Sequence, residues 1–176
     1  MINFRIVQNI ILLKIIFLFL NSCGFQVIYD HKKADSCINE LASIKIQKIR
    51  DRKSQELKNS LYDALNPQKV KAESSYILAY NISKTLAPTY ITETGSSGRY
   101  RININIDYKL KRISDKKIIS SGYVNVNDNY DVSSNRYATH TAENYVVSNL
   151  LDLGAKEIRN SIVNDLTSYC IKNNSL

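Results

Sequence analysis

The residues from Tyr100 to Leu110 alternate strictly between apolar and polar side chains. Successive side chains of a β-strand point to opposite faces, so one face of this stretch is apolar and the other is polar. The apolar face comprises Tyr100, Ile102, Ile104, Ile106, Tyr108 and Leu110. The polar face comprises Arg101, Asn103, Asn105, Asp107 and Lys109. The stretch is therefore predicted to be a strand of an antiparallel sheet with one buried and one wet face.

Three other stretches have strand patterns, at residues 43–49, 75–86 and 117–127. Residues 87–98 contain Pro88 and two glycines, which predicts a loop between the second and third strands. The short polar run at residues 114–116 predicts a tight turn that joins the last two strands into a hairpin.

A first helix is predicted between the first two strands. Asp51 is a candidate N-cap, and Leu57, Leu61 and Leu65 recur every four residues, which places them on one helix face. The helix is predicted to end at Asn66, because a residue before proline avoids the helical region.

A second, longer helix is predicted from about Ser134 to Tyr169. Its apolar stripe comprises Val147, Leu151, Ala155, Ile158, Ile162, Leu166 and Tyr169. Gly154 lies inside it and costs about 1 kcal/mol relative to alanine. The glycine is therefore predicted to mark a kink or a close contact between the helix and the sheet.

The predicted element order is β-α-β-β-β-α. Both helices can bury their apolar stripes on one face of the sheet, which leaves the other face exposed. The predicted fold class is α+β, a two-layer sandwich of about four strands with two helices packed on one face. This single domain is predicted to span residues 43–176.

The N-terminus has the pattern of a secretory signal. Residues 10–20 are apolar apart from Lys14, follow the positively charged Arg5 and are too few to span a bilayer comfortably. The string Leu20-Asn21-Ser22-Cys23 is typical of the site where a bacterial lipoprotein is cleaved and acylated. Residues 1–22 are therefore predicted to be a signal peptide, Cys23 to carry lipid such as palmitate, and residues 23–42 to form a tether. The alternative is an uncleaved anchor that happens to contain a cysteine.

The chain has a net charge of +8, which favours polyanionic partners such as nucleic acid, anionic lipid or a phosphorylated glycolipid. Export disfavours nucleic acid among these. The candidate binding residues lie along one strand and its end: Arg99, Arg101, Lys109, Lys111 and Arg112. Arginine binds phosphate through a bidentate fork, which suits a phosphorylated glycolipid. The alternative is a solvated outer face whose lysines deter edge-to-edge aggregation.

The sequence contains no nucleophile-elbow, zinc-protease or phosphate-loop motif, and no cysteine–histidine cluster that would hold a metal. No catalytic residue, cofactor or metal is therefore expected. His140, Glu143 and Asp131 could form a fragment of a proton relay, although a surface histidine at a helix start is the commoner arrangement. Cys37 and Cys170 are an even remainder after Cys23 and could form a disulfide; the alternative is two unpaired thiols.

The segment from Cys23 to Tyr29 resembles the start of mature LptE, a lipopolysaccharide-assembly lipoprotein, although Val-Ile stands where that family has Pro-Leu. Residues 51–61 are similar to the first helix of the family. Residues 98–101, which open a strand, and residues 130–137, which precede the last helix, are also similar.

The resemblance implies a two-layer α/β fold seated in the lumen of the outer-membrane β-barrel LptD. It implies help in assembling that barrel, contact with lipopolysaccharide during export, and an outer-membrane location facing the periplasm and the barrel lumen. The basic lipid-binding positions of the family fall near Glu93 and Thr139, which are not basic, so they are not carried over. Two alternatives remain: a generic envelope lipoprotein that binds anionic lipid or glycan, and a periplasmic glycan hydrolase using Glu143 or Asp131.

Overall fold

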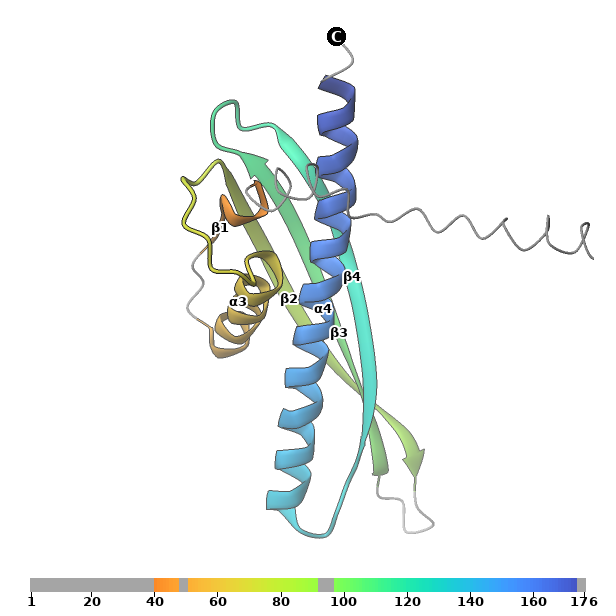
Figure 1. The fold of residues 1–176 in the computed structure, drawn as a ribbon. Coiled ribbons are helices and arrows are strands. Elements are labelled where there is room, and N and C mark those ends of the chain that lie inside the picture. The colour runs from red at the N-terminus through yellow and green to blue at the C-terminus, as the bar shows by residue number, and fades with distance from the viewer. Residues whose placement is uncertain (1–39, 48–50, 92–96, 174–176) are drawn as a thin grey trace, which may run out of the picture. The chain divides into compact units, whose positions relative to one another are not determined.

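The structure is a computed structural model that describes residues 40–47, 51–91 and 97–173, all within one compact unit, Asp35–Leu176 (Figure 1). The elements, labelled as in Figure 1, are β1 (Ile44–Ile46), α3 (Arg52–Leu65), β2 (Tyr76–Ile91), β3 (Ser97–Arg112), β4 (Ile118–Asp131) and α4 (Arg136–Asn173). The predicted order of strands and helices is confirmed. The predicted signal peptide lies outside the described residues.

The four strands form one sheet in the order β1-β2-β3-β4. β1 pairs with β2 in parallel, whereas β2–β3 and β3–β4 pair antiparallel. The sheet has two ends that matter for function. We call the end where β2 stops and β3 starts the far end, and the end that holds the turn between β3 and β4 the near end.

The prediction of a loop across residues 87–98 is wrong in its first part, because β2 continues to Ile91. The short β1 pairs only with the beginning of β2, so the far half of β2 has β3 as its one partner. An edge position tolerates Pro88, which lacks an N–H to donate. The register shifts there, between Pro88 and Tyr90.

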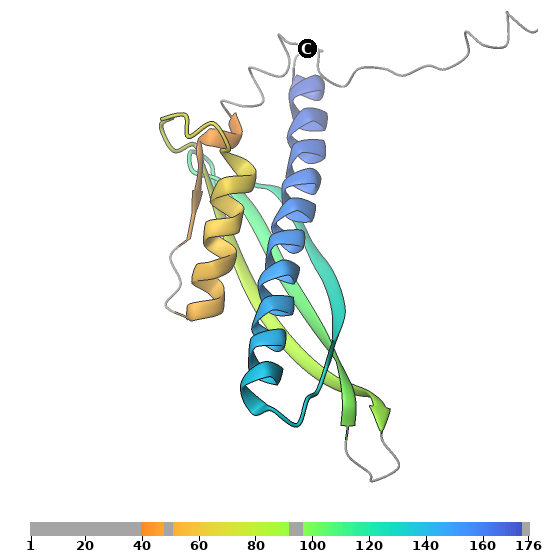
Figure 2. The same cartoon turned by 60° about the horizontal axis from the view of Figure 1, so that its bottom comes forward.

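Helices α3 and α4 cover the same face of the sheet, as two views of the ribbon show (Figures 1 and 2). The predicted leucine stripe of α3 is buried, and so is the predicted stripe of α4 as far as Leu166. The side chain of Tyr169 lies outside the described side chains. The two helices meet the predicted apolar face of β3, where residues 102, 104, 106 and 110 are at most 1% exposed.

A buried hydrogen bond joins α3 to the sheet. The hydroxyl of Tyr80 on β2 donates to the backbone carbonyl of Ser54 on α3 over 2.6 Å. Asp51 caps the same helix, because its Oδ2 accepts the backbone N–H of Ser54 at 3.3 Å. The predicted N-cap is therefore confirmed.

Helix α4 packs closely against the sheet at Gly154. A Cβ placed on Gly154 would lie 2.6 Å from Cδ1 of Ile106, on β3, which is closer than such atoms approach in proteins. Of the two roles predicted for this glycine, close contact with the sheet is confirmed.

The opposite face of the sheet is polar and is not covered by α3 or α4 (Figure 2). Asparagines on β3 and β4 stand opposite one another, as Asn103 pairs with Asn127 and Asn105 with Asn125. Within the described ranges, the helices include none that is long and apolar enough to cross a membrane.

Candidate functional site

A pocket of about 610 Å³ lies at the far end of the outer face. Its lining residues come from the ends of three strands: Thr89, Tyr90, Gly98, Arg99, Arg101, Asn129 and Asp131. Antiparallel pairing builds it, because Arg99 stands opposite Asp131 and Arg101 stands opposite Asn129. Two of the predicted binding arginines are thus brought together.

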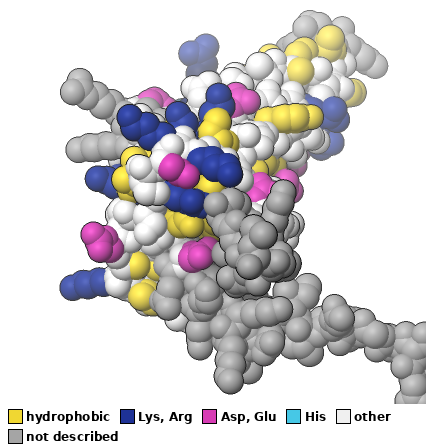
Figure 3. Space-filling view, turned by 90° about the horizontal axis from the view of Figure 1, so that it is seen from above, with side chains coloured by type: hydrophobic (Ala, Val, Ile, Leu, Met, Phe, Trp, Pro, Cys, Tyr) yellow, Lys and Arg dark blue, Asp and Glu magenta, His cyan; other side chains and the backbone are white. Residues whose placement is uncertain are grey.

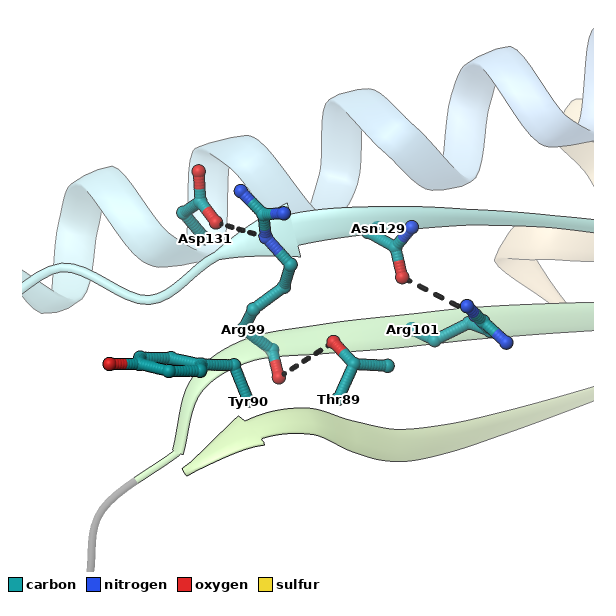
Figure 4. A pocket seen from close by; sticks show the side chains of 7 residues that line it. Thr89, Tyr90, Arg99, Arg101, Asn129 and Asp131 are labelled. Carbon is teal, nitrogen blue, oxygen red and sulfur yellow. Dashed lines mark hydrogen bonds and ion pairs between the residues drawn. The ribbon is translucent and has the colours of Figure 1, made fainter. Parts of the chain in front are cut away.

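Arg99 is bound to a carboxylate within this pocket. Its Nε lies 2.6 Å from Oδ1 of Asp131, and both side chains are more than half exposed (Figure 4). The hydrogen bond and the charge of Asp131 raise the pKa of Arg99, and the same hydrogen bond lowers the pKa of Asp131. Because water screens an exposed pair, it contributes little to stability, but it sets the local charge.

Arg101 has a neutral partner instead. Its Nε donates to Oδ1 of Asn129 over 3.4 Å, a long hydrogen bond (Figure 4). The pocket therefore holds two guanidinium groups and one carboxylate. An incoming anion would find the charge of Arg101 uncompensated and would compete with Asp131 for Arg99.

The other three predicted basic residues do not join this pocket. Lys109 is exposed between the two ends of β3, whereas Lys111 and Arg112 line a second pocket at the near end. Twelve residues of strand separate Arg99 from Lys111, which corresponds to roughly 40 Å. The five predicted basic residues are therefore divided between two pockets, with Lys109 in neither, and no single phosphate group could contact both pockets.

The predicted cysteine sites cannot be placed. Cys23 and Cys37 lie outside the described residues, and Cys170 belongs to α4 but its side chain is not among those described. Lipidation of Cys23 and a disulfide between Cys37 and Cys170 both stay predictions.

The residues of the hypothetical proton relay are held apart in separate pairs. Glu143 on α4 forms a half-buried ion pair with Lys84 on β2, and Asp131 is paired with Arg99. The ring Nε2 of His140 lies 3.0 Å from Nδ2 of Asn144. Within the described part of the chain, no three histidine, cysteine or acidic residues gather to hold a metal.

Asn129 was not predicted as a site residue, and Asp131 was considered only for a proton relay or a hydrolase, although the sequence held a signal that places both beside the arginines. Folding the predicted hairpin about Asp115 places residues 129 and 131 opposite residues 101 and 99, as the register shows. The second pocket had no such signal, because it gathers residues from β1, α3, β2 and the turn after β3.

The fold is that of bacterial lipoproteins. A putative lipoprotein from Caulobacter crescentus CB15 superposes with a TM-score of 0.61 at 18% identity, covering 76% of this chain and 97% of that one. The rare lipoprotein B from Shewanella oneidensis superposes with a TM-score of 0.51 at 10% identity, covering 74% and 96%. At these identities the likeness shows the fold alone.

Sequence comparison gives the family. Residues 41–168 match LptE, described as lipopolysaccharide-assembly, and the chain belongs to this family. A curated relative, the uncharacterized protein RP188 of Rickettsia prowazekii, is 29% identical over 144 residues, which are 82% of this chain and 88% of the relative. The resemblance seen in the sequence is confirmed, and the chain is a non-enzymatic protein of lipopolysaccharide assembly.

Proposed function

We propose that this protein is an outer-membrane lipoprotein, acylated on Cys23, that serves as plug and assembly factor for the β-barrel LptD and contacts lipopolysaccharide during transport to the cell surface. Membership in the LptE family supports a role in lipopolysaccharide assembly. The observation that carries the lipid contact is the far-end pocket, where Arg99 and Arg101 lie side by side.

The outer face of the sheet supports a barrel as the partner. Its middle carries the paired asparagines Asn103 and Asn127 and Asn105 and Asn125, whose amides both donate and accept hydrogen bonds, and Asn125 already donates to Asn105 across the strands. The interior of a large membrane barrel is likewise polar. This amide-rich middle can exchange its water for the hydrogen bonds of such a wall, whereas the nearby charges of Asp107 and Lys109 would have to stay in contact with water.

The proposal is tested first by fractionation and pull-down of tagged protein. We expect the wild-type protein to float with outer-membrane vesicles and to co-purify with a large β-barrel. Cys23→Ala should strongly reduce the amount that floats with outer-membrane vesicles, because the acyl chains on that residue would provide the main anchor. A wild-type protein found only with the inner membrane, and without a barrel, would contradict the proposal.

The pocket makes a specific prediction about lipopolysaccharide binding. Arg101→Glu should weaken binding at least about tenfold, because it removes the uncompensated cation and repels phosphate. Asp131→Asn should strengthen binding severalfold, because the amide keeps the size of the side chain and releases Arg99 for the ligand. Binding would be measured with purified lipopolysaccharide at two salt concentrations.

Lys109→Glu is the matched control, because Lys109 is an exposed cation on the same face of the same strand but outside the pocket. It should change binding by less than about threefold. Equal losses in Arg101→Glu and Lys109→Glu would show that net charge alone attracts the lipid. That result would favour a generic envelope lipoprotein that binds anionic lipid.

A further inference from the structure

We propose that the near end of the domain carries a second binding surface, distinct from the arginine pocket, that docks on the anionic phospholipid headgroups of the membrane. We call it the near-end groove. It has a volume of about 740 Å³. Its floor and rim are formed by Lys45, Ile46, Gln47, Lys58, Tyr62, Ile77, Ala79, Lys111, Arg112, Ile113 and Lys116.

The groove carries a high density of positive charge. Five of its lining residues are basic, and no acidic residue is among those described as lining it. Asp115 beside the rim contacts Arg112 at 3.5 Å and so compensates one of the five. A view from the near end shows lysine and arginine side chains interspersed with apolar side chains and with a few acidic ones (Figure 3).

Apolar side chains lie exposed between these charges. Tyr62, Ile77 and Ile113 are 44%, 39% and 43% exposed. Lys58 extends over the ring of Tyr62, with its Nζ 5.6 Å from the ring centroid. Aromatic and aliphatic groups among lysines are the composition of surfaces that enter the headgroup layer of a bilayer.

The predominance of lysine among the basic residues of the groove favours a membrane surface as the ligand over a single phosphate group. Four of the five bases are lysines, which act as flexible point charges, whereas arginine binds one phosphate through a fixed fork. Lysines near an anionic leaflet each gain attraction without a fixed geometry. The arginine pair at the far end, by contrast, suits a single phosphate group held in a fixed geometry.

The position of the groove agrees with this occupant. Backbone hydrogen bonds place the start of the described chain beside it, since Ile113 donates to the carbonyl of Ser75 and Ser75 donates to that of Ser43. The described chain therefore begins at the near end, and Cys23 precedes it in the sequence. A lipid on that cysteine would hold the groove within reach of the membrane.

The test is flotation of a chain that begins at residue 24, which removes the anchor and keeps the whole described core, from Leu41 to Leu166. It should bind vesicles that contain phosphatidylglycerol and should bind pure phosphatidylcholine at least about tenfold more weakly. The triple variant Lys45→Glu, Lys111→Glu, Lys116→Glu should lose about a hundredfold in affinity for the anionic vesicles, at roughly fivefold per cation.

The matched control is the triple variant Lys53→Glu, Arg136→Glu, Lys156→Glu, which changes the net charge by the same amount at exposed positions outside the groove. It should keep most of the binding. Circular dichroism should show both triple variants to be folded, because all six side chains are exposed.

Three results would overturn the proposal: equal binding to neutral and anionic vesicles, equal losses in the two triple variants, or displacement by millimolar inorganic phosphate. The last would indicate a site for a discrete anion. None of these results bears on the arginine pocket, because Arg101 and Asp131 are unchanged in all the proteins tested.

Discussion

Replacing Gly154 with leucine is expected to lower the free energy of unfolding by about 3 kcal/mol. The Cβ alone would lie 2.6 Å from Cδ1 of Ile106, and the leucine side chain would have to displace α4 from the sheet. Ile106 is fully buried, so a side chain as large as leucine could be accommodated only by shifting packed neighbours or the helix itself. Urea denaturation should show a lower midpoint with an unchanged slope.

Two variants separate this effect from the chemistry of leucine. Lys156→Leu places leucine on the same helix at an exposed position, and it should change the free energy of unfolding by no more than about 0.5 kcal/mol. Gly154→Ala should cost less than leucine, because it gains about 1 kcal/mol of helix propensity and the atom that its Cβ would approach at 2.6 Å is the terminal methyl of Ile106, while the other neighbours lie at 3.9 Å. An unchanged midpoint for Gly154→Leu would contradict the close approach of α4.

Tyr80 is expected to make the domain sensitive to alkali. Burial raises the pKa of its phenol from 10.0 to about 12. A pKa that is higher in the folded protein means that the stabilisation is complete below pH 10 and is lost as the pH rises to 12. We expect a loss of up to about 2 kcal/mol across that window, measured by denaturation at successive pH values.

Tyr80→Phe should cost about 1 kcal/mol at neutral pH, because the hydroxyl no longer donates to Ser54. It should also remove part of the alkaline loss. Burial raises the pKa of Tyr130 as well, so some sensitivity should remain. Tyr123→Phe is the control, since that ring is 76% exposed and its replacement should leave the profile unchanged. Identical profiles for the wild type and Tyr80→Phe would refute this account.

The parts of the fold that could be predicted from sequence are those with a strong local period. In β3, apolar and polar side chains alternate without interruption, and in α3 and α4 the apolar residues repeat at helical spacing. The buried face of each element can therefore be predicted from its sequence. The far half of β2 has no such signal, because the structure leaves residues 85–91 exposed. This half of β2 is a strand because it pairs with β3, and that pairing leaves no hydrophobic periodicity in the sequence.

The basic character of the candidate site could be predicted from the sequence, but its division between two pockets could not. The basic character of β3 is visible in the sequence, and so are the two arginines at its start. The division of its charges between two pockets depends on strand length, which places Arg99 and Lys111 far apart. The groove at the near end draws Lys45, Lys58 and Lys116 from three different parts of the chain, so only the tertiary fold brings them together.

The length of β3 gives the domain a mechanical property. A continuous strand that pairs on both sides is stiff along its axis, and here it joins the arginine pocket to the near-end groove. With phospholipid at one end and lipopolysaccharide at the other, β3 would act as a strut that keeps the two lipids roughly 40 Å apart.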